Sequence, residues 1–235
     1  MRHFRDPWFN YVHWFDINEP HTSLSIEAQI TLNTSSQYAA GFPLQVPFSA
    51  LQEMRDDSIR IFTKSSTYVD IDRAVWKEAI DVSHGSEGIF EAAQAIMRHV
   101  HTQWLYMPGT THASTHMREV MTQRRGVCQD FAHVMIGLCR ALGIPTRYVS
   151  GYLYNGPADS LRGAQASHAW CEVHIPAHGW FGLDPTNNTL ADERHAKIAT
   201  CRDYADAAPL TGTFDGPANA TSSLQVELEI ISDPA

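Results

Sequence analysis

The sequence has few of the features that identify disulfide-rich, secreted or membrane proteins. It contains only four cysteines in 235 residues, and no two of them form a C-x-x-C pair, so a disulfide framework is the weakest interpretation of them. No apolar run approaches the roughly 20 residues of a membrane-spanning helix. The N-terminus lacks the apolar segment of a signal peptide. We therefore expect a cytoplasmic protein with reduced thiols and no membrane partner.

Positive charge and nucleotide-binding motifs are scarce as well. Lys and Arg number 17 against 26 Asp and Glu, which gives a formal net charge of -9. Without a basic stripe to displace counterions from phosphates, no nucleic-acid partner is expected. A P-loop, a dinucleotide fingerprint and the G-x-S-x-G turn of serine hydrolases are all missing. The sequence therefore favours neither a nucleotide-dependent enzyme nor a serine hydrolase of that type, and we predict no cofactor.

The thirteen histidines do not indicate a metal site. Only His112 and His116, in "HASTH", have the i, i+4 spacing of two ligands on a helix, and the glutamate of the zincin motif is missing. Helix capping or solvent contact fits them better. Zinc bound through Cys128 and His168 would need two further ligands, and no convincing set is present. We therefore predict no metal and keep a metal-dependent hydrolase as an alternative that chelation would reveal.

Alternating apolar and polar residues predict strands near both ends of the chain. The pattern is strictest in residues 23–32 (SLSIEAQITL), which we interpret as a half-buried strand. Residues 10–17 (NYVHWFDI) suit an antiparallel partner, and residues 224–231 (LQVELEII) alternate in the same way. We expect residues 1–75 to form a β-rich N-terminal portion. An unpaired edge strand near residues 11–32 could pair with a second copy of the chain and form a homo-oligomer.

Helical periodicity dominates the middle of the sequence. Residues 88–106 carry apolar side chains at helical spacing, and a short helix is expected at residues 113–123. The clearest pattern is that of residues 126–142, where one apolar stripe follows the helix and Gly143 then ends it. The stripe consists of Val127, Phe131, Met135, Leu138 and Leu142.

Strands follow these helices along the chain. Residues 146–154 (TRYVSGYLY) form the first strand, and residues 167–175 and 180–184 form a hairpin around "PAHG". Helices followed by a run of strands indicate an α+β domain rather than a parallel βαβ sheet. We assign residues 76–235 to this core, in which the helix of residues 126–142 packs on an antiparallel sheet.

Cys128 lies in the expected first turn of the helix of residues 126–142. Free cysteines are usually buried packing residues, and this fits Cys139 in the middle of the same helix. The two would lie about 16 Å apart, too far for a disulfide. A helix N-terminus, however, stabilises thiolate, the form that attacks carbonyl carbons. From its position alone, Cys128 is equally compatible with a packing residue and with a nucleophile.

The hairpin supplies a base and a carboxylate that could orient it. The odd positions of residues 167–175 are apolar, so the even positions, beginning with His168, share the other face. Asp184 in the second strand lies on that same face, at nearly the height of His168. This arrangement requires an odd number of loop residues, three or five. A carboxylate beside an imidazole ring fixes the useful tautomer, as it does in catalytic triads.

Three blocks of sequence resemble one known family. They are "RRGVCQDFAHVMIGLCRALGIPTRYVSGYLY", "SHAWCEVHIPAHGWFGLDPTNN" and "CRDYADAAPLTGTF". In this order they resemble the transglutaminase-like superfamily of papain-like fold, and within it the bacterial proteins regarded as candidate cysteine proteases. The resemblance covers roughly residues 85–235. It implies that Cys128 is the nucleophile, His168 the general base and acid, and Asp184 the residue that orients the imidazole. Residues 9–29 resemble the end of the β-rich leader of those proteins, here shortened.

The predicted activity is acyl transfer through Cys128. The thiolate attacks a carbonyl of a peptide, protein or amide substrate, and His168 protonates the leaving amine. Water then gives a protease or amidase, which we favour, and an amine gives a transglutaminase. The rival of another class is a peptide-binding module that keeps the fold without catalysis. The backbone N–H of Cys128 is one expected donor to the oxyanion. Candidates for the second donor are Trp104, Tyr106 and Thr115.

Structural roles are expected for several neighbouring residues. Asp130 and His133 should make hydrogen bonds within the fold, with Arg147 as one partner. Trp170 and Trp180 could wall a substrate groove, although packing is the commoner role of such residues. The turn after Asp184 should be capped by Asn187 and Asn188.

Overall fold

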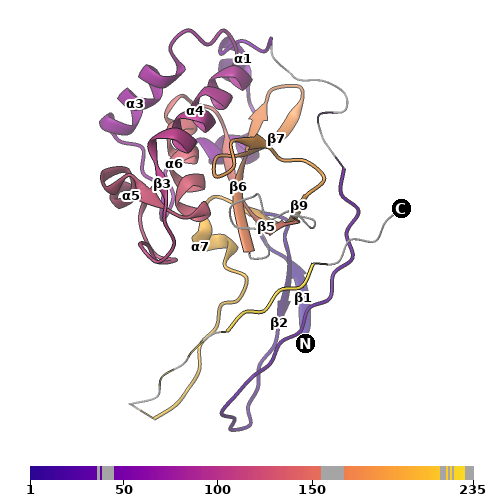
Figure 1. The fold of residues 1–235 in the computed structure, drawn as a ribbon. Coiled ribbons are helices and arrows are strands. Elements are labelled where there is room, and N and C mark those ends of the chain that lie inside the picture. The colour runs from indigo at the N-terminus through magenta and orange to yellow at the C-terminus, as the bar shows by residue number, and fades with distance from the viewer. Residues whose placement is uncertain are drawn as a thin grey trace.

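The computed structural model combines a layer of helices with a five-stranded antiparallel sheet, and this confirms the α+β fold (Figure 1). Long extended segments leave this body near both ends of the chain (Figure 1). Within the described part of the chain, no helix is long and apolar enough to cross a membrane. The structure describes residues 1–35, 38, 45–154, 167–217, 221, 223 and 225–230.

Three of the four longer helices lie within the predicted ranges. They are α4, inside residues 88–106, α5, inside residues 113–123, and α6, inside residues 126–142. The short helix α5 begins later than residue 113, because a ring nitrogen of His116 accepts the backbone N–H of Arg118 and caps the helix there. The helices are α1 (Ser49–Glu53), α2 (Asp57–Arg60), η2 (Ile61–Thr63), α3 (Arg73–Ser83), α4 (Ile89–Gln103), α5 (Met117–Gln123), α6 (Cys128–Ala141) and α7 (Tyr204–Ala207).

The five-stranded sheet has the order β8-β7-β6-β5-β9. The predicted hairpin is present as β6 and β7, with Ile175 paired to Gly179. Residues 176–178 therefore form a loop of three, the odd number that the alternation requires. The strands of this sheet are β5 (Thr146–Leu153), β6 (Ser167–Ile175), β7 (Gly179–Asp184), β8 (Thr189–Leu190) and β9 (His195–Cys201), and a separate parallel pair joins β3 (Leu105–Tyr106) to β4 (Arg125–Gly126).

Helix α6 packs directly on the sheet. All of its residues from Asp130 to Arg140 are buried. The thiol of Cys171 in β6 donates to the carbonyl oxygen of Ala132 over 3.3 Å. The apolar odd-numbered residues of β6 join the same hydrophobic core, namely Ala169, Cys171, Val173 and Ile175. The core thus lies between the helices and one face of the sheet, and the even-numbered residues of β6 occupy the other face.

Strand β9 contains a β-bulge opposite the middle of β5. Ser150 pairs with Ala199, but the next residue, Gly151, pairs with Lys197. Ile198 is therefore an extra residue in β9. One extra residue shifts the alternation of side chains by one position. Odd-numbered residues before the bulge therefore share a face of the sheet with even-numbered residues after it.

Both alternating runs near the ends of the chain differ from the prediction. Residues 24–32 have no regular secondary structure, and their large apolar side chains are about half exposed. Residues 225–230 form no strand either, while Leu224 and Ile231 lie outside the described residues. Alternation creates an apolar face, but a stable strand also needs a neighbouring strand and a core to bury that face. In the described chain, no neighbouring strand pairs with these segments and no core buries their apolar faces. The strand predictions for them are therefore wrong.

One N-terminal hairpin is present, with a partner other than the predicted one. β2 (Tyr11–Trp14) pairs with β1 (Arg2–Arg5), and with no other strand among the described residues. Residues 49–63 are largely helical, so the first 75 residues are less β-rich than predicted. The domain boundary after residue 75 and a homo-oligomer formed through the edge of β2 both stay predictions.

Candidate active site

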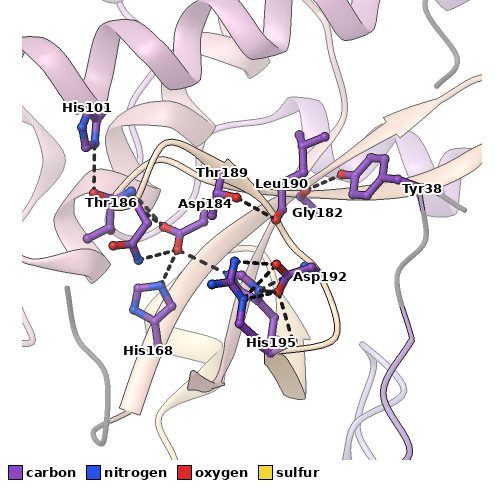
Figure 2. A network of polar contacts seen from close by, with 12 residues as sticks. Tyr38, His101, His168, Gly182, Asp184, Thr186, Thr189, Leu190, Asp192 and His195 are labelled. Carbon is purple, nitrogen blue, oxygen red and sulfur yellow. Dashed lines mark hydrogen bonds and ion pairs between the residues drawn. The ribbon is translucent and has the colours of Figure 1, made fainter. Parts of the chain in front are cut away.

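His168 and Asp184 meet on one face of the sheet, where the alternation places them. His168 is the second residue of β6, and Asp184 is the last residue of β7. Nε2 of His168 donates to Oδ2 of Asp184 over 2.8 Å, and both side chains are inaccessible to solvent. Figure 2 shows the two side chains pointing toward each other. A buried contact of this kind fixes the ring orientation and assigns the proton on this side to Nε2.

The turn after Asp184 holds its carboxylate in place. Oδ1 accepts the backbone N–H groups of Thr186 (2.9 Å) and Asn187 (3.2 Å), and the Asn187 side chain donates to Oδ2 (2.8 Å). Burial on its own raises the pKa of Asp184, but the charge of His168 and the hydrogen bonds outweigh it and hold the pKa well below its ordinary range. Asp184 is therefore ionised, which is the form that orients an imidazole.

Cys128 is the first residue of α6 and lies beside His168. Its thiol is partly exposed, whereas the other three cysteines, which are also free, are buried. Nε2 of His168 is taken by Asp184, and Nδ1 has no close hydrogen-bond partner among the described residues. Burial on its own lowers the pKa of His168, but Asp184 and the nearby Cys128 thiol outweigh it and raise the pKa to about 10. Nδ1 is therefore the nitrogen left to exchange a proton with Cys128.

Backbone contacts position the first turn of α6. Val127 is extended, and its N–H donates to Oδ2 of Asp130 over 2.8 Å, which caps the helix. The hydroxyl of Thr111 donates to the same oxygen over 2.7 Å. A Cβ atom at Gly126 would lie only 2.5 Å from that oxygen, so a larger residue would displace the cap. The glycine before Cys128 thus serves the helix N-terminus on which the thiol is placed.

His133 has a structural role, but not with the predicted partner. Its Nε2 accepts the backbone N–H of Tyr204 over 3.2 Å, which joins α6 to α7. Burial lowers the pKa of His133 to about 3, so the ring is neutral. Arg147 contacts neither His133 nor Asp130 through a hydrogen bond in the described chain; it binds Glu172 over 2.7 Å. The predicted contact with Arg147 is therefore wrong.

The tryptophans around the site are packing residues. Trp170 is only 1% exposed, and its ring packs against the two histidine rings of the site. Trp180 lies edge-on against Phe62. The indole N–H of Trp104 donates to the carbonyl oxygen of Val120 over 3.1 Å, so it cannot serve an oxyanion. Tyr106 and Thr115 stay predictions for the second oxyanion donor.

Asp184 has a further partner that the sequence patterns did not indicate. Nε2 of His195, at the start of β9, lies 3.4 Å from Oδ2 of Asp184. Figure 2 shows the Asp184 carboxylate with His168 on one side and His195 on another. Simple alternation along β9 groups His195 with Cys201 in the core, and none of the three resembling blocks includes it. The β-bulge, which carries no clear sequence signal, is the reason it was missed.

His168, Asp184 and His195 form a group that could hold a metal ion. One ligand atom from each lies within 4.8 Å of the others, and all three residues are buried. Each short contact is also explained by an imidazole N–H that donates to the carboxylate. Neither His112 nor His116 belongs to a metal-binding group among the described residues. Two imidazole N–H groups that donate to one carboxylate account for the arrangement without a metal ion. Chelation tests the metal alternative.

The His168–Asp184 pair should make stability depend on pH. The pKa of His168 is about 10 in the folded chain and roughly 6.5 in an unfolded one. A pKa that folding raises contributes stability below the unfolded value, and this stability is lost as the pH rises towards the folded value. We therefore expect the free energy of unfolding to fall by about 1–3 kcal/mol between pH ~6.5 and ~8.5.

Urea unfolding of the wild type and of His168→Gln across this interval checks the expectation. Glutamine does not titrate, so the variant should lose much less stability as the pH rises. The interval ends near pH ~8.5 because burial raises the pKa of the other three thiols, which adds its own loss of stability above that pH. Parallel curves for the two proteins would contradict the raised pKa of His168.

Comparisons with known proteins agree on one family. The family model described as "Transglutaminase-like superfamily" matches residues 77–185, the segment that contains Cys128, His168 and Asp184. An uncharacterised protein of Mycobacterium tuberculosis is 34% identical over 221 residues, which cover 88% of this chain and 70% of that protein. A protein-glutamine gamma-glutamyltransferase of Pseudomonas aeruginosa is 36% identical over 97 residues, which cover 37% of this chain and 14% of that protein.

A solved structure extends the agreement to the fold. A chain from Cytophaga hutchinsonii, named as a candidate cysteine protease, is similar with a TM-score of 0.59 and 34% sequence identity over 70% of this chain. The present chain spans 53% of that chain, about half of its length. The matched family model and these relatives establish that the chain belongs to the transglutaminase-like superfamily.

Proposed function

We propose that this protein is a cysteine-dependent hydrolase that cleaves peptide or carboxamide bonds through Cys128, His168 and Asp184. The observation that carries the proposal is the position of His168, which binds a buried carboxylate through one nitrogen and lies close to the Cys128 thiol. Thiol acyl-transfer enzymes require a nucleophile, a base close to it and a group that orients the base. Membership of the superfamily and the similarity to a candidate cysteine protease support a cysteine-dependent enzyme.

The proposed reaction consists of two acyl transfers. The Cys128 thiol gives its proton to Nδ1 of His168 and attacks the substrate carbonyl carbon, which forms a C–S bond. The negative oxygen of the intermediate faces the first turn of α6, whose backbone N–H groups have no partner within the helix. As the C–N bond breaks, the His168 imidazolium protonates the leaving nitrogen. Water that His168 deprotonates then hydrolyses the thioester and restores the thiol.

A second candidate function is transfer of the acyl group to an amine. The similarity to a protein-glutamine gamma-glutamyltransferase over 97 residues favours it. The same three residues would form the thioester from a glutamine side chain with release of ammonia. The two functions differ only in the second step, so a labelled primary amine separates them. A transamidase would attach the amine covalently to protein, whereas a hydrolase would release only a carboxylic acid and an amine or ammonia.

The first test of the proposal is the alkylation of Cys128 by iodoacetamide at several pH values, measured by peptide mass spectrometry. We expect Cys128 to react at least about tenfold faster than the buried Cys139, and to stay reactive near pH ~6.5, where an ordinary thiol is protonated. Burial raises the pKa of Cys139 to about 12, which makes it an unreactive reference in the same helix. Rates in urea give the reactivity of each thiol without the fold.

The variant His168→Ala decides between an activated thiol and one that is only exposed. Removal of the imidazole should abolish the reactivity of Cys128 at low pH, because the thiolate loses its positive partner. Exposure alone would make Cys128 faster than Cys139 in both proteins and at every pH. Equal rates with and without His168 would remove the support for an enzyme, and a peptide-binding module of the same fold would then be the better interpretation.

A further inference from the structure

We propose that His195 is a positioning residue of this site: its Nε2–H group holds the Asp184 carboxylate in the orientation in which it binds His168. The proposal rests on the proposed function of Cys128, His168 and Asp184. It adds a fourth residue, which does not touch the substrate and acts through Asp184.

The β-bulge in β9 turns His195 toward the site. Cys201, beyond the bulge, lies in the hydrophobic core. Lys197 and His195, before the bulge, reach the opposite face, where Nζ of Lys197 donates to Glu172 over 2.7 Å and His195 contacts Asp184. Without the extra residue, His195 would share the face of Cys201 and point away from Asp184. Bulges are over-represented next to active sites, where they redirect a side chain in this way.

The surroundings of His195 select the tautomer that can donate to Asp184. The backbone N–H of Asp192 lies 3.1 Å from Nδ1 of His195, and a backbone N–H can only donate. With Nδ1 accepting this N–H group, the ring proton lies on Nε2, opposite the Asp184 carboxylate, which can only accept. The Asp192 carboxylate, also 3.1 Å from Nδ1, is held by Arg194 through contacts of 2.9 and 2.5 Å. This loop thus fixes the position of the ring, and the Asp192 backbone N–H together with the Asp184 carboxylate favours the tautomer with the proton on Nε2.

His195 contacts Asp184 directly, and its ring centroid lies 6.2 Å from that of His168. Oδ2 of Asp184 accepts from His168 (2.8 Å), Asn187 (2.8 Å) and His195 (3.4 Å). The His195 ring also lies edge-on against Trp170 at 5.2 Å, and Trp170 stacks on His168 at 6.0 Å. The hydrogen bond from His195 is longer than the one from His168. His195 therefore limits rotation of the Asp184 carboxylate without displacing His168 from it.

Two variants distinguish a hydrogen-bond donor at residue 195 from a side chain that only fills space. Glutamine places an amide N–H near the position of Nε2 of histidine. Methionine has nearly the size of glutamine and cannot donate. His195→Gln and His195→Met therefore differ mainly in the hydrogen bond to Asp184, and His195→Leu serves as a second variant without a donor should His195→Met not fold.

The experiment compares second-order rate constants for alkylation of Cys128 by iodoacetamide at pH ~6.5. We expect His195→Met to react about tenfold more slowly than the wild type, because small misplacements of reacting groups cost one to two orders of magnitude. His195→Gln should stay within about twofold of the wild type. Melting temperatures measured alongside confirm that the compared proteins are folded. Equal rates for His195→Gln and His195→Met, whether fast or slow, would overturn the proposal.

His168→Ala, measured in the same series, distinguishes this proposal from the proposed function. If alkylation of Cys128 does not depend on His168, the proposed function fails and His195 has no pair to position. If the rate depends on His168 but not on a donor at residue 195, only the present proposal fails. Every rate is repeated with a chelator. A wild-type rate that changes with chelation would place a metal ion between His195 and Asp184 and would also overturn the proposal.

Discussion

Cys128→Ala is expected to lower the rate of acyl transfer by at least about 10⁴-fold. Without Sγ no thioester can form, and the remaining groups provide only binding and oxyanion contacts. Hydrolysis is measured as new N-termini or ammonia released from a protein substrate such as casein, and transamidation as a labelled alkylamine incorporated into it. The same assays with a chelator test the metal-dependent alternative, which predicts a loss of activity in the wild type.

Asp184→Asn should cost about as much, roughly 10⁴-fold, for a different reason. Asparagine keeps the shape of the carboxyl group, but its amide nitrogen can donate to Nε2 of His168. Nε2 must then accept, and the ring proton moves to Nδ1, the nitrogen that faces Cys128. In this tautomer His168 cannot take the thiol proton. The rate should therefore fall even in folded protein, although the amide nitrogen cannot accept the hydrogen bonds that Asn187 and His195 donate to Asp184.

Cys139→Ala is the matched control for both variants. Cys139 lies in the same helix, is fully buried and has no contact with His168. Its replacement should leave the rate of acyl transfer within about twofold of the wild type, because Cys139 takes part in no step of the proposed reaction. A wild type that is active and remains active in Cys128→Ala would refute the assignment of the nucleophile. Equal losses in Cys139→Ala would point to destabilisation instead.

Arg140→Met is expected to lower the free energy of unfolding by about 3–5 kcal/mol, because several hydrogen bonds of a charged group are lost together. The Arg140 side chain is 2% exposed, and its guanidinium donates to the carbonyl oxygens of Thr146 (3.0 Å), Lys64 (3.0 Å) and Arg202 (2.6 Å). It thereby joins the end of α6 to β5 and to two loops. Methionine keeps most of the volume but leaves the buried carbonyl group of Thr146 and the part-buried ones of Lys64 and Arg202 without this donor.

Urea unfolding at neutral pH measures this effect. The control is Arg98→Met on the exposed face of α4, which should change the free energy of unfolding by less than about 0.5 kcal/mol. Because Arg140 lies far along α6 from Cys128, folded Arg140→Met protein should keep the alkylation behaviour of the wild type at Cys128. A loss below about 1 kcal/mol would show that water replaces the guanidinium at these carbonyl groups.

The sequence alone determined the parts of this protein whose periodicity is local. Apolar spacing of 3.6 residues marked α6 and placed Cys128 in its first turn, and alternation with a short loop placed His168 and Asp184 on one face of a hairpin. These features depend on neighbouring residues along the chain, and backbone geometry converts them directly into positions. The pairing of β6 with β7 could therefore be predicted, with an odd loop of three or five residues, and the structure has three.

Only the tertiary structure decided the features that depend on residues far apart in sequence. The approach of α6 to β6 brings Cys128 close to His168, and the bulge opposite β5 brings His195 to Asp184. Alternation in residues 23–32 predicted a strand that is not present, because an apolar face does not specify what will cover it. Local patterns fix which side of an element a residue faces, but packing between elements decides which residues meet there.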